Sequence, residues 1–187
     1  GDLSGEFLRV VEEARPAWFL RENTPQAPSI QPAGYGVSKF LLDNAWIDSG
    51  DGLGNEQMRK RMFWFGLRDR EPVDLRNFLK YATLQLPTLL PATSCDGRKG
   101  HREGRTGAVT GRHDGHVGSP TRDYSTRYTF EEMCRLQGLD PAVFEHCPFT
   151  MQAKKKIVGN GVPLMMGRAL AAAIACVVEA ELEAPSD

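Results

Sequence analysis

The chain has 187 residues, of which 41% are hydrophobic and 25% charged, and its formal net charge is −1 at pH 7. This length favours one domain, or one domain with a small appendage, and the composition is ordinary for a globular protein. The near-zero net charge argues against a uniformly basic nucleic-acid-binding protein, although it says nothing about local basic patches.

The chain contains four cysteines, none of them in a Cys-x-x-Cys spacing: Cys95, Cys134, Cys147 and Cys176. We therefore expect reduced thiols in an intracellular, cytoplasmic protein, and no metal site. No signal peptide is visible, because a charged amphipathic segment follows Gly5 at once. The Ala-rich stretch 162–178 contains Arg168 and is shorter than the roughly 20 residues of a membrane span, so we expect a buried helix and no membrane contact.

The first elements are a helix and a strand. Apolar residues at helical spacing predict a helix over Ser4–Ala14, which Arg15-Pro16 ends. The apolar run Ala17–Leu20 then predicts a short buried strand. Because a helix, a turn and a buried strand form half of a βαβ unit, we expect an earlier strand outside this chain.

Apolar spacing predicts a second helix over Tyr35–Ala45, followed by a brief strand at Trp46-Ile47. The nearly continuous apolar run Met62–Leu67 predicts a strand that is covered on both faces and lies beside the first strand. Asp74 predicts the N-cap of a further helix, which runs to about Leu86.

Between Pro91 and Thr126 glycine, arginine and histidine dominate, which predicts a long, exposed, basic loop. Helical signals then return. Thr129 and Glu132 form a capping box for a helix that ends at Gly138. The remaining predicted elements are a short helix at Asp140-Pro141, a basic turn capped by Thr150 and a final helix from Pro163.

Three short motifs could carry chemistry. A carboxyl such as Glu22, just after a buried strand, suits a general acid because burial disfavours the charged form. Arg59 and Arg61 alternate, so they point to one face and could grip a base carbonyl and a phosphate. The helix N-terminus after Gly159–Pro163 could offer N–H groups to a polar ligand. Taken alone, the first motif also fits a solvated loop, the second a positively charged strand end, and the third an ordinary turn.

The motifs occur in an order that resembles the C-terminal half of the DNA (cytosine-5)-methyltransferase family. This order is Glu22-Asn23, Gln57-x-Arg59-x-Arg61, Arg127-x-Thr129 with Arg135-Leu136-Gln137-Gly138, and Gly159-Asn160-Gly161-Val162-Pro163. The resemblance implies an α/β fold, the C-terminal part of a doubly wound, Rossmann-like sheet with a small irregular target-recognition region. It divides the chain into a catalytic part at 1–67, the recognition region at 68–125 and a helical return at 126–187.

In this family a thiolate adds to cytosine C6, which turns C5 into a nucleophilic carbon, and an acid near N3 neutralises the developing charge. The cytosine first leaves the duplex and is gripped by its Watson–Crick edge. The resemblance implies that Glu22 is this acid, with Asn23 orienting its loop, and that Arg61 holds the flipped base beside Arg59. It also implies that Asn160 and Val162 contact the methyl donor S-adenosylmethionine.

The expected macromolecular partner is double-stranded DNA. Arg127 resembles part of the motif that supports the recognition region. The basic loop suits phosphate contacts, which depend on salt and not on sequence. The candidate DNA-binding residues are Arg98, Arg102, Arg105 and Arg112 in this loop, together with Arg127.

The chain departs from the family pattern in three respects. Thr24 stands where the family usually has valine, no cysteine follows a proline, and no strand, Gly-rich turn and helix open the chain. We therefore expect methyl transfer to need a complementary N-terminal half, which supplies the nucleophile and cofactor loop. Because missing neighbouring strands would leave an unpaired sheet edge, we expect the chain to bind this half or to form a homodimer. Two alternatives remain: a non-catalytic DNA-binding or interaction remnant of this fold, and an unrelated α/β protein with chance motifs.

Overall fold

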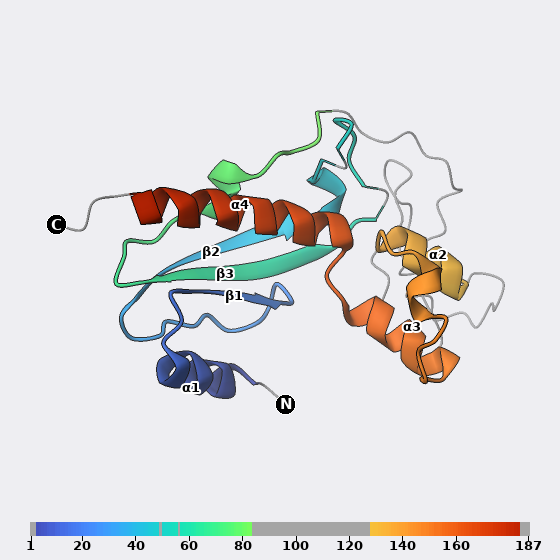
Figure 1. The fold of residues 1–187 in the computed structure, drawn as a ribbon, viewed down its shortest axis with the longest axis horizontal. Helices are drawn as coiled ribbons and strands as arrows, with labels where there is room; N and C mark the ends of the chain where they lie inside the picture. The colour runs from blue at the N-terminus through green and yellow to red at the C-terminus, as the bar shows by residue number, and fades with distance from the viewer. Residues whose placement is uncertain (1–2, 49, 56, 84–127, 184–187) are drawn as a thin grey trace. The chain divides into compact units, whose positions relative to one another are not determined.

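The structure is a computed structural model that describes residues 3–48, 50–55, 57–83 and 128–183 (Figure 1). It divides into two compact units. Of the described residues, unit 1 comprises 3–42, 60–79 and 172–183, and unit 2 comprises 43–48, 50–55, 57–59, 80–83 and 128–171. Most of the predicted recognition region, residues 68–125, lies outside the described residues, so the predicted domain boundaries stay a prediction.

Unit 1 is built on a three-stranded sheet of β1 (Trp18–Asn23), β2 (Tyr35–Asp43) and β3 (Lys60–Arg68), with β3 in the middle (Figure 1). β1 and β3 run antiparallel, with Trp18 opposite Leu67 and Asn23 opposite Met62. The predicted pair of adjacent strands is therefore confirmed. In this antiparallel pair Phe19 lies opposite Gly66, where an added Cβ would come within 2.2 Å of the Phe19 ring. Gly66 thus leaves room for a core phenylalanine.

The helix predicted over Tyr35–Ala45 is wrong, because β2 occupies most of this segment. The N–H of Asp69 donates to the Gly34 carbonyl at 2.8 Å, and the Phe40 ring stacks on Phe63 at 5.8 Å. These two contacts occur in opposite order along the two strands, so β2 runs antiparallel to β3. The segment's apolar residues fit both periods, and pairing with β3 decides in favour of the strand because sheet formation depends on neighbours more than on local preference.

Two further predicted elements are also wrong. Trp46-Ile47 is not a strand, since Asn44–Trp46 forms the short 3₁₀ helix η1 and Ile47 makes an isolated bridge with Tyr81. Asp74 does cap a helical turn, and its carboxylate accepts from the Arg76 N–H at 3.0 Å. However, only the 3₁₀ helix η2 (Leu75–Phe78) follows, and the next residue, Leu79, is extended.

The core of unit 1 lies partly between α1 (Ser4–Ala14) and the sheet. It joins Val11 of α1 to sheet residues that include Phe19, Tyr35 and Trp64. The rings of Phe7 and Phe19 meet edge to face at 5.6 Å between their centroids. Further buried side chains come from the C-terminal part of α4, at Ala173, Ile174 and Val177.

Unit 2 contains α2 (Phe130–Leu136), the 3₁₀ helix η4 (Pro141–Phe144), α3 (Met151–Asn160) and the first part of α4 (Leu164–Glu183). These helices confirm the predicted starts, including the Thr129–Glu132 capping box, and α3 is a full helix where only a turn was predicted. Their core comprises Tyr128, Phe130, Met133, Cys134, Leu136 and Val158. Among the described helices none has by itself the length and hydropathy to cross a membrane; α3 and Leu164–Ala180 reach them only as a bent pair.

Candidate functional site

Glu22 and Arg61 form an ion pair on one face of the sheet. Glu22 lies opposite Phe63 in the β1–β3 pair, and Arg61 lies two residues before Phe63 on the same strand. Alternate residues of a strand share a face, so Arg61 is the diagonal neighbour of Glu22. Arg61 Nε lies 2.8 Å from Glu22 Oε1, with side-chain exposures of 18% and 29%. The pair is therefore held in place and still open to a ligand.

The loop after β1 is fixed by its own polar groups. Asn23 Oδ1 accepts from the Thr24 N–H at 2.7 Å, and the Ala27 N–H donates to the Thr24 carbonyl at 3.0 Å. A side chain that bonds the backbone just ahead of it favours a turn. Asn23 thus shapes the chain directly beyond Glu22, and Thr24 takes part through its backbone.

Arg21, on the opposite face of β1 from Glu22, was missed by the sequence analysis. Its side chain is 6% exposed, and its guanidinium donates to the Pro28 carbonyl at 2.9 Å and to the Ser4 hydroxyl. It also lies 4.6 Å from the centre of the Trp64 ring. Arg21 therefore ties α1 and the loop beyond Glu22 to the sheet. The available signal was an arginine directly after the apolar run Ala17–Leu20, in the same strand.

Arg59 lies in unit 2 and is 1% exposed. Its Nη2 donates to the Gly159 carbonyl at 2.9 Å. Its own N–H donates to the Asp43 carboxylate at 2.9 Å, and its carbonyl accepts from the Asn44 N–H at 3.1 Å. Arg59 is thus linked to the Gly-Asn-Gly motif that lies 100 residues further along the chain.

Gln57, the first residue of the same motif, is also fully buried. Neither the nitrogen nor the oxygen of its side-chain amide has a hydrogen-bond partner among the described residues. Its backbone carbonyl accepts from the Asn44 side chain at 3.3 Å. Gln57 is thus held beside Arg59 through its backbone.

Asn160 and Val162 are both exposed, directly after the buried Gly159. Gln137 holds this turn from the other side, because its Nε2 donates to the Val158 carbonyl at 2.9 Å. Its backbone carbonyl accepts from the Leu164 N–H, also at 2.9 Å. One N–H of the first turn of α4 is therefore already used, which reduces the ligand-binding capacity predicted for that helix start.

The structure thus brings the predicted site residues together in two groups, Glu22 with Arg61 in unit 1, and Arg59 with the turn containing Asn160 in unit 2. The remaining predicted residues are those expected to bind DNA. They lie outside the described residues: Arg98, Arg102, Arg105, Arg112 and Arg127.

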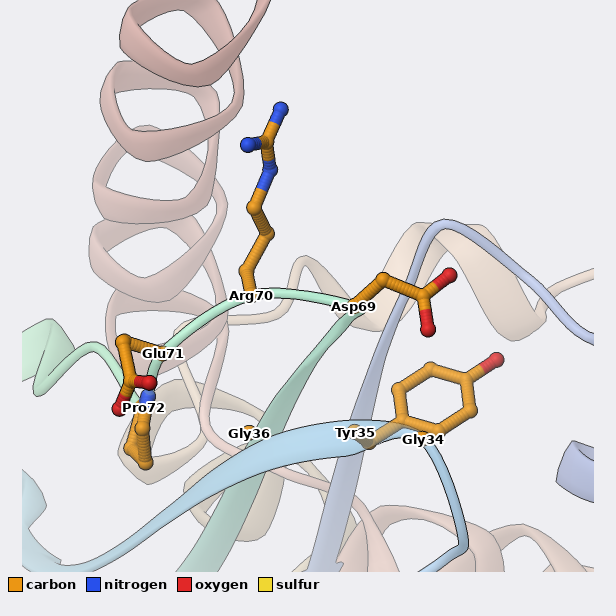
Figure 2. A pocket seen from close by; sticks show the side chains of 7 residues that line it. All are labelled: Gly34, Tyr35, Gly36, Asp69, Arg70, Glu71 and Pro72. Atoms are coloured by element: carbon orange, nitrogen blue, oxygen red, sulfur yellow. The ribbon is translucent and has the colours of Figure 1, made fainter. Parts of the chain in front are cut away.

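A pocket of about 600 Å³ lies elsewhere in unit 1, between the start of β2 and the segment after β3 (Figure 2). Its lining contains none of the predicted site residues and consists of Gly34, Tyr35, Gly36, Asp69, Arg70, Glu71 and Pro72. Figure 2 shows the Arg70 side chain extending away from β2. The Tyr35 hydroxyl donates to the Pro16 carbonyl at 2.6 Å, and burial raises the pKa of this hydroxyl.

No family model and no curated protein matches the chain. Among solved structures, it is similar to the Dnmt2 methyltransferase of S. pombe, with a TM-score of 0.52 and 12% identity over 90% of this chain and 66% of that one. A methyltransferase of Entamoeba histolytica, EhMeth, matches with a TM-score of 0.47 and 12% identity over 90% of this chain and 64% of that one. The chain spans just under two thirds of either protein's length. The first likeness confirms the predicted α/β, methyltransferase-like fold class.

Proposed function

We propose that this chain is part of a DNA cytosine-5 methyltransferase, which transfers a methyl group from S-adenosylmethionine to C5 of a flipped cytosine. The observation that carries the proposal is the Glu22–Arg61 ion pair, 2.8 Å between Oε1 and Nε, at neighbouring strand ends of a methyltransferase-like fold. The order of the four motifs along the chain supports the same reaction.

The ion pair suits the polar edge of cytosine. That edge carries an amino donor, the N3 acceptor and the O2 carbonyl acceptor side by side. Glu22 would face the amino group and N3, and the Arg61 guanidinium would donate to O2. As a nucleophile adds to C6, negative charge spreads to N3 and O2. Glu22 would enter this step in its carboxylic acid form, give its proton to N3, and be left as the carboxylate that pairs with Arg61, whose positive charge would neutralise the charge at O2.

The methyl donor would lie against the exposed turn that contains Asn160 and Val162. The polar amide of Asn160 and the apolar side chain of Val162, which is 37% exposed, suit a ligand with both polar edges and an apolar ring. When bound, S-adenosylmethionine supplies an electrophilic methyl group. Asn160 and Val162 would orient it, and they would take no part in the bond changes.

The nucleophile would come from a second chain or segment. None of the four cysteines follows a proline. Cys134 is a poor candidate in any case, because burial raises the pKa of its thiol and the thiolate is the reactive form. We therefore propose that a complementary N-terminal half supplies the Pro-Cys loop and most of the cofactor site.

The test is methyl transfer from labelled S-adenosylmethionine to duplex DNA, with this chain alone and with a complementary half that carries a Pro-Cys loop. We expect activity only in the mixture. Glu22→Gln should slow it by about 10²–10⁴-fold, the usual contribution of a positioned acid, with DNA affinity nearly unchanged. Glu12→Gln, on an exposed face of α1, is the matched control.

Three results would contradict the proposal. Robust activity of the chain alone would place the nucleophile within it. A Glu22→Gln mixture as fast as the wild type would remove Glu22 from the mechanism. Transfer to cytosine in RNA, with none to DNA, would overturn the substrate class.

A second candidate function is a non-catalytic DNA-binding remnant of this fold, for which the arginine-rich segment between Arg98 and Arg112 would also be suited. It predicts no methyl transfer in any mixture, together with DNA binding that survives the loss of Glu22. The mixing experiment therefore separates the two candidates.

A further inference from the structure

The Arg59 guanidinium is engaged inside unit 2. With 1% exposure it is the most buried charged side chain of the described residues, and it donates to the Gly159 carbonyl at 2.9 Å. The backbone that carries it is anchored as well, because the Asp43 carboxylate accepts from the N–H groups of Arg59 at 2.9 Å and Ala45 at 3.1 Å. Hydrogen bonds therefore hold both the backbone and the guanidinium of Arg59 in place beside Gly159.

Gly159 lies in the last turn of α3, where the Gly161 N–H caps the Ile157 and Val158 carbonyls and the Gly159 carbonyl accepts from Arg59. A positive charge is favourable at this end of a helix, because the carbonyl dipoles point towards it. Gln137 binds the neighbouring Val158 carbonyl at 2.9 Å. Two side chains from distant parts of the sequence thus hold consecutive carbonyls, and the next residues, Asn160–Val162, are exposed.

We propose that Arg59 is a positioning residue, which fixes the exposed segment Asn160–Val162 for ligand binding and does not contact the flipped base. Only the identity of the ligand, S-adenosylmethionine, rests on the function proposed above. The anchoring itself rests on the buried bond between Arg59 and Gly159. Arg59 and Arg61, two residues apart, would then serve different substrates of one reaction.

The anchoring is tested on the chain by amide hydrogen exchange, with Arg59→Met and the conservative Arg59→Lys. We expect Arg59→Met to speed exchange at Gly161, whose N–H donates to the Ile157 carbonyl at 3.1 Å, by about tenfold or more. Exchange at Met133 of α2 should stay unchanged. Arg59→Lys keeps the charge and should recover part of the protection.

Arg168→Met is the matched control, because it removes an exposed arginine from the first part of α4 and should leave the Gly161 amide unaffected. Unchanged exchange at Gly161 in both Arg59 variants would overturn the anchoring. If Arg59→Met does not fold, the comparison of Arg59→Lys with the wild type is the test. Protection of the Gly161 amide in Arg59→Lys that equals the wild-type value would then contradict a specific guanidinium contact.

The role in the reaction is tested by steady-state kinetics of the methylating mixture. Loss of the Arg59 contact should weaken the binding of S-adenosylmethionine equally in the ground state and in the transition state. KM for S-adenosylmethionine should therefore rise about tenfold, while kcat should change by less than about twofold. Glu22→Gln should instead lower kcat. The proposal would be overturned if Arg59→Lys lowered kcat, or if it raised KM for DNA without raising KM for S-adenosylmethionine. A mixture without any methyl transfer would refute the proposed function, and the exchange data would still decide the anchoring.

Discussion

Glu22 and Arg61 lie diagonally across the antiparallel pair of β1 and β3, with Arg61 Nε 2.8 Å from Glu22 Oε1. Each residue holds the other's side chain, and both are partly exposed. A carboxylate and a guanidinium in such a fixed geometry form a ready-made binding site for a ligand edge that carries donors and acceptors side by side. The two residues should therefore behave as one functional unit.

This coupling predicts the kinetics of substitutions at both positions. Arg61→Lys should lower kcat of the methylating mixture by about 10²-fold, because an ammonium does not reproduce the planar fork of donors. Combined with Glu22→Gln, it should cost much less than the product of the two single effects. A double-mutant cycle on kcat measures this. Fully multiplicative effects would show that the two side chains act independently.

The arginines of the basic segment should contribute to DNA affinity through phosphate contacts. Changing Arg98, Arg102, Arg105 and Arg112 together to glutamine should make the slope of log affinity against log salt shallower by about 3 to 4, at roughly 0.9 per phosphate contact. Fluorescence anisotropy of labelled duplex DNA at several salt concentrations provides the slope. Arg9→Gln on α1 serves as the control, and an equally steep slope in the fourfold variant would exclude contact between these arginines and DNA.

Gly36 lets β2 pass close to the segment after β3. A Cβ at this position would lie 2.1 Å from the Arg70 carbonyl oxygen, so the backbone would have to shift. Gly36→Ala should therefore lower the free energy of unfolding by about 1–3 kcal/mol. Gly5→Ala, in α1 with no atom within 4 Å of the new Cβ, should raise it by about 0.5–1 kcal/mol. Urea unfolding measures both, and equal effects of the two substitutions would refute the close approach.

Arg21 should stabilise unit 1. Arg21→Met removes the donor to the Pro28 carbonyl and the charge beside the Trp64 ring, which should cost about 1.5–3 kcal/mol of the free energy of unfolding. Arg9→Met removes only an exposed pair with Glu6 and Glu13, and its effect should be smaller. Urea unfolding compares the two variants. A smaller loss for Arg21→Met than for Arg9→Met would contradict the anchoring role of Arg21.

Tyr35 predicts a loss of stability at alkaline pH. Burial raises the pKa of its hydroxyl above the ordinary value of 10.0. The unfolded chain therefore ionises first, so this contribution is complete below pH 10 and is lost as the pH rises through the higher pKa of the folded state. The difference in unfolding free energy between wild type and Tyr35→Phe should be constant at neutral pH and shrink above about pH 10. A difference that grows with pH would contradict the sign.

Local signals in the sequence were sufficient for several elements. α1, β1, β3 and the Thr129–Glu132 cap of α2 were all predicted, because each is specified by neighbouring residues. Apolar runs, prolines that end helices and hydroxyl or carboxyl caps act within a few residues of where they occur. The likeness to a methyltransferase structure then confirmed the fold class.

β2 shows where such signals fail. Its apolar residues fit both a helical and an alternating pattern, and the choice depends on β3, which begins 25 residues after the start of β2. Pairing across that distance supplies backbone hydrogen bonds and the stacking of Phe40 on Phe63, neither of which has a local signature.

The same holds for the candidate site. The sequence alone identified Glu22, Arg59 and Arg61 as residue types suited to base recognition, because charge and hydrogen-bonding capacity belong to the side chain itself. Only the tertiary structure decided that Arg61 meets Glu22 and that Arg59 meets Gly159, 100 residues away. Which partner a buried arginine binds follows from strand register and helix placement, and these are set by packing between distant segments of the chain.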